Sequence, residues 1–319
     1  MSAAVAVASH SFPKNPTLRD ELLSRYPDAD FNETRSPLSG RSLIEFLKGH
    51  EKAITGLEAL DDRVFDAVPE LRIVSKYGVG LDTIDLQAAA RHGVSIRWTA
   101  GVNRQSVAEL TIALMIMLAR NVSAVSSDLR HGTWTAGHGR QLSSATVGVL
   151  GCGNVGQTVA RLCRSFGARV VVHDIKSYDD FYNEVGIVPV GFAALLREAD
   201  FVSIHVPLDA ATRGMIGSGE LAMMKPSAFL INTARGGIVD ETALKHALVD
   251  NRIAGAGCDV FNVEPPADTE LLSLPNFVGT PHIGGSSVEA VLAMGRAAIR
   301  GLDDETLAIS FGNGPLSRT

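Results

Sequence analysis

One stretch decides the fold of this chain, Val147-Gly148-Val149-Leu150-Gly151-Cys152-Gly153-Asn154-Val155-Gly156. Its G-x-G-x-x-G pattern follows an apolar, β-branched run and precedes a helix-compatible stretch, Gln157–Ser165. Gly151 permits a tight turn, Gly153 lets the backbone approach a pyrophosphate, and Gly156 allows close helix packing. The N–H groups and the dipole at the helix start then hold phosphate charge. The pattern predicts a dinucleotide-binding turn. Taken without other motifs, three such glycines in a Gly-rich chain could also form an ordinary strand–turn–helix.

The acid after the next apolar run bears on the choice of cofactor. The run Arg169–His173 ends at Asp174, which lies 18 residues past Gly156. A carboxylate at this point meets the adenine-ribose hydroxyls and repels the ribose phosphate of NADP. Of the next two residues, Ile175 and Lys176, only the lysine offers a partner for such a phosphate. The sequence therefore favours NAD over NADP as the cofactor.

Short β-branched runs alternate with helical stretches on both sides of this turn, which indicates parallel sheets covered by helices. The helical stretch Ser106–Arg120 is apolar on most faces, so we expect it to be buried between layers. This organisation predicts an α/β fold of two units joined through long helices. The expected strands are Val5–Ala8, Ala53–Thr55, Leu71–Ser75, Val94–Ile96, Val147–Leu150, Val170–His173, Phe201–His205, Phe229–Asn232 and Gly255–Val260, and further helices are expected at Thr17–Arg25, Ser42–Leu47 and Val288–Leu302.

Composition excludes several classes of function. The 319 residues carry a net charge of −6, and no stretch is basic enough to track a nucleic-acid backbone. The three cysteines lack metal-ligand spacing, so we expect buried, reduced thiols and no metal site. The first residues, Met1–Ser11, are typical of a strand and not of a signal peptide. The most apolar stretch, Ile112–Ala119, is far shorter than the ~20 residues of a membrane span. A soluble, cytoplasmic protein is expected.

Three later motifs each follow a probable strand, at the sheet edge where α/β proteins bind ligands. They are Asn232–Asp240, which contains Arg235; Gly257–Phe261, which is followed by Glu264; and Thr280–Ser286, which contains His282. Each has an ordinary interpretation when taken singly: an Arg-Gly-Gly turn, a solvent-facing acid and a satisfied loop histidine. Their joint occurrence behind a nucleotide-binding turn favours a catalytic set.

These motifs, in this order, resemble the D-isomer-specific 2-hydroxyacid dehydrogenase family, which includes D-3-phosphoglycerate dehydrogenases and glyoxylate/hydroxypyruvate reductases. The resemblance covers nearly the whole chain. It implies a Rossmann NAD-binding domain at residues 101–285, inserted in a discontinuous flavodoxin-like α/β substrate domain at 1–100 and 286–319. It also implies an active site in the cleft, a homodimer, and an NAD-dependent oxidoreductase that interconverts a small-molecule D-2-hydroxy acid and its 2-oxo acid.

The resemblance implies a role for each motif residue. Arg235 would hold the substrate carboxylate and 2-oxo oxygen, because a planar guanidinium offers paired donors in fixed geometry. His282 would be the acid–base residue that gives a proton to the carbonyl oxygen as hydride arrives from the nicotinamide, or takes one in the oxidative direction. Glu264 would orient the ring and favour its protonated form. Asp259 would hold the nicotinamide carboxamide.

Further residues match family positions in the remaining parts of the chain. In Lys76–Asp85, the N–H groups around Val79 and Gly80 would bind the substrate carboxylate, in a turn capped by Asp85. The expected cofactor residues also include Asn154, Val155, His205, Pro207, Thr212 and Thr233, and the expected substrate residues also include Lys76 and Asn103. Trp134, near the family's dimer contact, is expected to be an ordinary core or interface residue.

The chain also departs from the family pattern. Phosphoglycerate-specific members supply arginines where this chain has Gly56 and Lys76; glycine carries no charge, and a lysine is a point charge without the guanidinium fork. This puts 3-phosphoglycerate in doubt, while a specialised reductase of a phosphorylated or phosphonylated oxo acid stays open. No C-terminal regulatory domain is expected, since the sequence ends at Thr319. Glu264 argues against formate oxidation, for which relatives carry an amide. An NAD-sensing binding module of the same fold is the alternative from another class.

Overall fold

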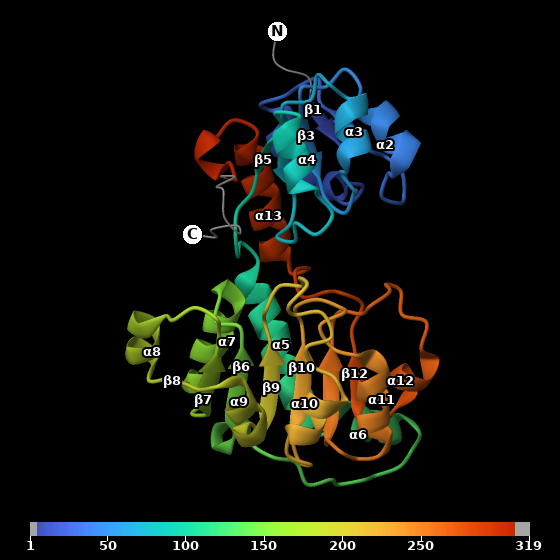
Figure 1. Cartoon of the computed structure of the whole chain (residues 1–319). Coiled ribbons are helices and arrows are strands. Elements are labelled where there is room, and N and C mark those ends of the chain that lie inside the picture. Colours follow the sequence, from blue (N-terminus) through green and yellow to red (C-terminus); the bar gives the residue numbers. More distant parts are fainter. Residues whose placement is uncertain (1–4, 310–319) are drawn as a thin grey trace. The chain divides into compact units, whose positions relative to one another are not determined.

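The computed structural model describes residues 5–309. The chain divides into two compact units, Met1–Asn103 with Val288–Thr319 (unit 1) and Arg104–Ser287 (unit 2) (Figure 1). These limits differ by two to three residues from the domain boundaries expected at residues 100 and 286. The parts of the expected substrate domain at 1–4 and 310–319 lie outside the described residues. Each unit is described by itself below.

Unit 1 is built on a five-stranded sheet in the order β2-β1-β3-β4-β5. All four strand pairings are parallel, and this 2-1-3-4-5 order is that of flavodoxin-like sheets, as expected. Its elements are β1 (Val5–Val7), a 3-10 turn (Phe12–Lys14), α1 (Pro16–Leu23), β2 (Asp30–Phe31), α2 (Gly40–Leu47), β3 (Lys52–Thr55), α3 (Asp62–Ala67), β4 (Ile73–Lys76), α4 (Leu86–Arg91), β5 (Ser95–Arg97), α13 (Val288–Gly301) and a last 3-10 turn (Glu305–Leu307).

The core of unit 1 lies on both faces of this sheet, because successive side chains of a strand point to opposite faces. Val5 and Val7 of β1 pack into the cluster that α1 and α13 cover, which includes Leu18 and Ala298. Ala6 and Ala8 instead belong to the cluster that α2, α3 and α4 cover. The return of the chain through α13 therefore completes one face of this unit (Figure 1).

Unit 2 is built on a seven-stranded sheet in the order β12-β11-β10-β9-β6-β7-β8. All its pairings are parallel, and the order reverses next to β6, as in a Rossmann sheet. Its elements are α5 (Arg104–Ala119), α6 (Val122–Arg130), a 3-10 turn (Leu142–Ser144), β6 (Thr146–Leu150), α7 (Asn154–Ser165), β7 (Arg169–His173), α8 (Asp179–Val185), β8 (Val188–Pro189), α9 (Phe192–Glu198), β9 (Phe201–Ile204), α10 (Ser218–Met223), β10 (Phe229–Asn232), α11 (Glu241–Val249), β11 (Gly255–Cys258), α12 (Thr269–Ser273) and β12 (Phe277–Gly279).

Helices cover both faces of this sheet. Residues of α5 and α7 form one core cluster with the strands, and residues of α9, α10 and α11 form the other. Eight residues of α5 are buried, which confirms that this apolar helix lies inside the protein. Cys152, Cys163 and Cys258 are free and buried, as expected. Burial raises the pKa of each of these thiols to about 12, so all three are unreactive near neutral pH.

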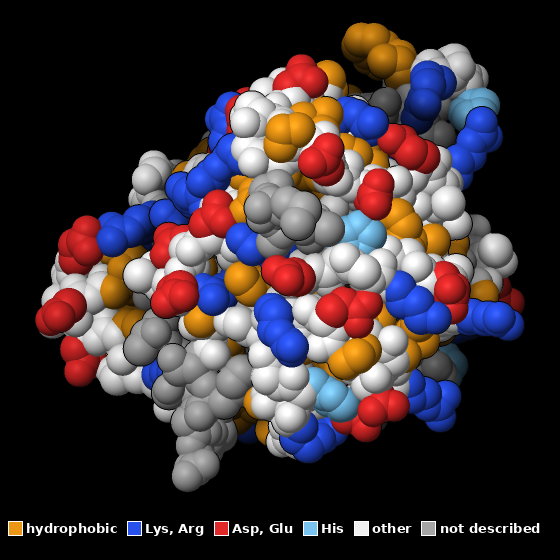
Figure 2. All heavy atoms as spheres, turned by 90° about the horizontal axis from the view of Figure 1, so that it is seen from above, with side chains coloured by type: hydrophobic (Ala, Val, Ile, Leu, Met, Phe, Trp, Pro, Cys, Tyr) orange, Lys and Arg blue, Asp and Glu red, His pale blue; other side chains and the backbone are white. Residues whose placement is uncertain are grey.

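The segment after α5 decides between the two expectations for Trp134, a core or an interface residue, only as far as the core is concerned. Trp134 is 87% exposed, so it is not a core residue. The helix α6 before it buries none of its residues, and Leu129 is also exposed. No single helix among residues 5–309 is long and apolar enough to cross a membrane; α5 and α6 reach that criterion only as a pair, bent by 64°. Figure 2 shows acidic and basic side chains interspersed over the face that it draws.

Candidate active site

The glycine turn between β6 and α7 has the geometry that a dinucleotide requires. Gly151 has a φ of +93°, and a Cβ there would lie 2.7 Å from the carbonyl carbon of His205. A Cβ on Gly156 would lie 1.9 Å from the Gly151 oxygen, so only glycine allows the helix to start this close to the strand. A Cβ on Gly153 would instead project into open space. Asn154 and Val155 form the first turn of the 12-residue helix α7, whose start attracts anions.

Asp174 follows β7 and reaches back to this turn. One carboxylate oxygen accepts a hydrogen bond from the Cys152 N–H at 2.5 Å, and the other accepts one from the Lys176 N–H at 2.8 Å. Backbone donors thus fix the carboxylate beside the phosphate-binding turn. This is where an acid would meet the ribose of a dinucleotide.

The loop after β9 carries three of the expected cofactor residues. The His205 Nε2 lies 2.8 Å from the Ser203 hydroxyl, while its Nδ1 is buried and has no partner among the described residues. Burial lowers the pKa of His205 to about 3, so its ring is neutral. Further along, the Thr212 hydroxyl donates to the Pro207 carbonyl at 2.6 Å and accepts from the Asp209 N–H at 2.9 Å. Hydrogen bonds within the loop therefore hold its conformation.

Arg235 lies in the tight turn after β10. The buried Asn232 side chain accepts from the Ala234 N–H at 3.1 Å and donates to the Arg235 carbonyl at 2.9 Å, which shapes the turn. The Arg235 guanidinium, half-buried, donates to the Ala234 carbonyl at 2.7 Å. Next to it, the Thr233 hydroxyl is buried 2.8 Å from the hydroxyl of Thr111 in α5.

Asp259, directly after β11, organises the loop that contains His282. Its carboxylate is 1% exposed and accepts hydrogen bonds from the Thr280 hydroxyl at 2.6 Å, the Ile283 N–H at 2.8 Å and the Gly284 N–H at 2.7 Å. Its carbonyl accepts from the His282 N–H at 2.9 Å. His282 has a φ of +55°, a left-handed conformation that costs a non-glycine residue about 1–3 kcal/mol and persists only where the surrounding structure holds it. The bonds from Asp259 hold the loop in this conformation.

His282 and Glu264 form a direct pair. The His282 Nδ1 lies 2.7 Å from one carboxylate oxygen of Glu264, and the other oxygen accepts from the Phe261 N–H at 3.1 Å. The side chains of His282 and Glu264 are 48% and 38% exposed, so a small molecule can reach them. Arg235, Glu264 and His282 therefore all lie beyond the carboxyl ends of neighbouring or nearby strands of one sheet.

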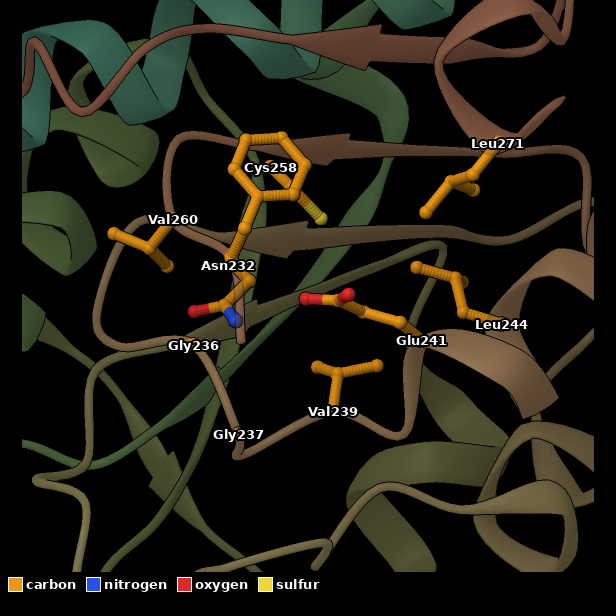
Figure 3. Close-up of a pocket in the computed structure, with 10 residues that line it drawn as sticks. Asn232, Gly236, Gly237, Val239, Glu241, Leu244, Cys258, Val260 and Leu271 are labelled. Atoms are coloured by element: carbon orange, nitrogen blue, oxygen red, sulfur yellow. The ribbon is translucent and has the colours of Figure 1, made fainter. Parts of the chain in front are cut away.

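The structure adds Glu241, which the sequence did not single out. Its carboxylate accepts from the Asn262 N–H at 2.6 Å, and Figure 3 shows it extending toward Asn232 in a narrow pocket. Above this pocket, a Cβ on Gly236 would lie 1.9 Å from the Phe261 carbonyl oxygen. The Arg235 turn and the Glu264 loop thus pack backbone against backbone, and Glu241 ties the second loop to the start of α11. An acid beside the helix-capping Asp240 was the available signal, but it is also typical of a solvated first helical turn.

The carboxyl edge of the unit 1 sheet holds a second group of expected residues. Lys76, the last residue of β4, is 6% exposed, and its ammonium donates to the Gly56 carbonyl and, at 3.3 Å, to the Thr83 hydroxyl. Glu58, which the sequence analysis missed, is 1% exposed and accepts from the Gly56 N–H at 2.6 Å. Lys76 and Glu58 therefore both bind the backbone of Gly56. The sequence indicated only the lysine and the glycine at this place.

The expected substrate loop follows β4. Gly78 has a φ of +131°, and the Val79 carbonyl accepts from the Trp98 indole N–H at 2.9 Å. Asp85 caps α4 through the Ala88 N–H, as expected. Asn103 lies in the turn that ends this first part of unit 1 and is half-buried.

Comparison with known proteins identifies the family. The model of the NAD-binding domain of D-isomer specific 2-hydroxyacid dehydrogenases matches residues 112–284. A glyoxylate reductase from Korarchaeum cryptofilum is 40% identical over 270 residues, 82% of this chain and 81% of the relative. A D-3-phosphoglycerate dehydrogenase from Methanocaldococcus jannaschii is 36% identical, over 82% of this chain and 51% of the relative. D-Lactate dehydrogenase from Aquifex aeolicus, solved with NAD and lactic acid, matches with a TM-score of 0.82 and 26% identity over 93% of each chain.

The chain belongs to the D-isomer specific 2-hydroxyacid dehydrogenase family. This confirms the family, the fold class and the class of enzyme predicted from the sequence, an NAD-dependent oxidoreductase. The residues present fit NAD. The open space beside Gly153 and the start of α7 suit a pyrophosphate.

Proposed function

We propose that this protein interconverts a D-2-hydroxy acid and its 2-oxo acid with His282 as the acid–base residue. The observation that carries the proposal is the 2.7 Å contact between the His282 Nδ1 and the Glu264 carboxylate. This contact leaves Nε2 to give a proton to the substrate oxygen during reduction and to take one during oxidation. Glu264 holds the ring in one orientation and stabilises its protonated form. NAD, when bound, supplies or accepts the hydride.

Unit 1, as the substrate domain, and Arg235 bind the substrate in this proposal. Arg235 offers a fork of N–H donors to the carboxylate and the 2-oxo oxygen, which polarises the carbonyl. The N–H groups of Val79 and Gly80 bind the carboxylate, and the bond from Trp98 to the Val79 carbonyl supports their orientation. Lys76 and Asn103 complete the proposed substrate residues.

The cofactor residues extend along the carboxyl edge of the unit 2 sheet. We assign the pyrophosphate to the glycine turn and the adenine ribose to Asp174, whose charge disfavours NADP. The carboxylate of Asp259 holds the His282 loop, and Asp259 would hold the nicotinamide carboxamide when NAD is bound. The remaining proposed contacts are those of Gly151, Gly153, Asn154, Val155, Gly156, His205, Pro207, Thr212 and Thr233.

The test is NADH consumption by the purified protein across a panel of 2-oxo acids. The panel contains glyoxylate, hydroxypyruvate, pyruvate, 2-oxoglutarate, phosphohydroxypyruvate and phosphonopyruvate, each also assayed with NADPH. His282→Gln is compared with His246→Gln, which removes an exposed histidine from α11 in the same unit. We expect turnover with NADH on at least one acid, a loss of about 10³-fold or more in kcat/KM for His282→Gln, and no comparable loss for His246→Gln.

Two results would overturn the proposal. Tight NADH binding without turnover on any acid would favour an NAD-sensing binding module. Turnover that survives His282→Gln within a factor of ten would remove His282 from the acid–base role.

We also propose a cytoplasmic homodimer. The exposed apolar side chains of Leu129 and Trp134, in and after the helix α6 that buries none of its residues, support a contact with a second copy. The three free cysteines support a reducing compartment. We expect Leu129→Arg combined with Trp134→Ser to convert dimer to monomer in sedimentation velocity, while Phe166→Ser, at a separate exposed aromatic residue, leaves the dimer intact. A monomeric unmodified protein would contradict the proposal.

A further inference from the structure

Glu58 is a buried charge to which the proposed chemistry gives no role. It is 1% exposed, and one carboxylate oxygen accepts from the Gly56 N–H at 2.6 Å. The other oxygen is buried and has no hydrogen-bond partner among the described residues. A buried carboxylate with an unfilled acceptor is costly, so a fold retains one where the charge has a use.

A buried cation lies on the other side of the same glycine. Glu58 accepts from the N–H of Gly56, and the ammonium of Lys76 donates to the carbonyl of Gly56. No larger residue fits between them without movement, because a Cβ on Gly56 would lie 2.9 Å from the Ser9 hydroxyl oxygen. The two charges thus form one fixed pair, Lys76–Gly56–Glu58, at the end of β3 and β4.

This pair flanks the loop that we assign to the substrate carboxylate. Lys76 is the last residue of β4, immediately before the loop, and its ammonium also donates to Thr83 on the far side of the loop at 3.3 Å. Glu58 follows β3, which pairs directly with β4. Both charges therefore lie at the same sheet edge as the N–H groups of Val79 and Gly80.

From this placement we infer that Glu58 is a specificity-determining residue, which selects 2-oxo acids without a second anionic group over phosphorylated ones. The inference rests on the proposed function. A phosphate ester carries a charge of about −1.5 to −2 at pH 7 and requires an excess of positive charge at its subsite. Lys76 alone would supply such an excess, but Glu58 cancels it and repels the phosphate inside a region of low dielectric. Glyoxylate and hydroxypyruvate carry no second anionic group and avoid this repulsion.

The experiment measures a ratio of substrates. The full-length protein and its Glu58→Gln variant are assayed with NADH on hydroxypyruvate and on phosphohydroxypyruvate. The unmodified protein should prefer hydroxypyruvate. In Glu58→Gln the amide oxygen still accepts from Gly56 but the charge is gone, so the kcat/KM ratio of phosphorylated to unphosphorylated acid should rise at least tenfold. Both acids are assayed on one preparation, so a fraction of unfolded protein leaves the ratio unchanged.

Two variants serve as controls. Glu70→Gln removes a carboxylate that likewise accepts from a glycine N–H, that of Gly49 at 2.6 Å, but at the amino edge of the same sheet. Glu58→Asp keeps the charge. Both should keep the ratio of the unmodified protein within threefold.

Each outcome decides the matter. A preference of the unmodified protein for phosphohydroxypyruvate, or a ratio that Glu58→Gln leaves unchanged or lowers, would overturn the inference while the proposed dehydrogenase activity stands. No turnover of any 2-oxo acid by the unmodified protein would instead remove the proposed function, and this inference with it. The ratio of the unmodified protein is decisive even if Glu58→Gln does not fold.

Discussion

The carboxyl edges of the two sheets hold their charged residues in opposite ways. In unit 2 the His282 and Glu264 side chains are 48% and 38% exposed, and backbone N–H groups hold the loops that carry them. In unit 1 Lys76 and Glu58 are 6% and 1% exposed, and both bind the backbone of one glycine. A group that exchanges protons must touch the substrate, whereas a charge that selects substrates acts through its field and can be buried. Variants of the proposed proton-transfer and substrate-anchoring residues of unit 2 should therefore slow all substrates alike, and variants of Glu58 in unit 1 should change the choice among them.

Among the variants that test this difference between the two units, we expect the largest loss of kcat/KM at Arg235. Arg235→Lys keeps the charge but loses the planar fork of donors, so the substrate carbonyl is neither oriented nor polarised. We expect kcat/KM to fall by about 10³-fold on every 2-oxo acid that is turned over, with the ratio among acids unchanged. Arg252→Lys, at an exposed position before β11, is the matched control. A change in substrate ratio above tenfold would place Arg235 among the selecting residues instead.

A smaller loss is expected when Glu264 loses its charge. Glu264→Gln keeps a side chain of the same size that can contact the His282 ring, but it no longer stabilises the protonated ring. We expect kcat to fall by about 10²-fold, with NADH affinity, measured by fluorescence titration, within threefold. Glu270→Gln in α12 controls for the general effect of removing an acid. An unchanged kcat would mean that the 2.7 Å contact has no part in the chemistry.

Much of unit 2 was predictable because its signals are local. The glycine spacing of Gly151–Gly156 is visible in the sequence because the turn is sterically restricted to glycine, and short apolar runs indicated β6, β7 and β10. The two-residue strands β2 and β8 gave no such signal, since one contains an aspartate and the other a proline. For Trp134 the sequence left core and interface open, because an apolar side chain is buried within its own chain only where the rest of its segment also packs.

The contacts of two acids could not be predicted, for a different reason. An acid in a loop or in a first helical turn is usually solvated, and nothing in the sequence around Glu58 or Glu241 shows that its carboxylate accepts a hydrogen bond from a backbone N–H. The same holds for Lys76, which the sequence placed near the substrate without showing that its ammonium binds the Gly56 carbonyl. Family motifs therefore predicted the candidate reacting groups, whereas the hydrogen bonds of Glu58, Glu241 and Lys76 to backbone groups became visible only in the structure.

A variant of Glu241 tests whether the position of the loop that carries Glu264 affects the rate of catalysis. Glu241→Ala removes the acceptor of the Asn262 N–H and should lower kcat about tenfold, while the KM for the oxo acid stays within threefold. Glu241→Gln keeps an acceptor oxygen and should restore most of the lost rate. Glu220→Ala, which removes a carboxylate that accepts from Gly217 near the start of α10, should not alter kcat. A rise in KM without loss of kcat would assign Glu241 to substrate binding. It would contradict the proposed difference between the carboxyl edges of the two sheets.

The opposite, amino edge of the unit 2 sheet holds a buried carboxylate of a third kind. Asp200 precedes β9 and accepts from the Thr146 N–H at 2.8 Å, from Lys225 at 3.1 Å and from Arg140 at 3.3 Å. Burial by itself raises the pKa of Asp200, but the Thr146 amide, Lys225 and Arg140 together lower it below its usual range. Folding thus favours the charged form of Asp200. Asp200 lies at the opposite end of the strands from every proposed catalytic residue.

Asp200→Asn should therefore affect stability and leave the chemistry unchanged. Because the pKa of Asp200 is lowered in the folded state, its contribution to stability is present above the unfolded value of about 3.9 and is lost as pH falls through the folded value. We expect the variant to melt a few degrees lower at pH 7, with the difference shrinking below about pH 4, and to keep kcat/KM within twofold. Asp250→Asn, in the exposed turn after α11, should melt like the unmodified protein at both pH values. A drop in kcat/KM in a folded Asp200→Asn protein would show that residues at the amino edge also affect catalysis. The proposed difference between a catalytic carboxyl edge and a structural amino edge would then be wrong.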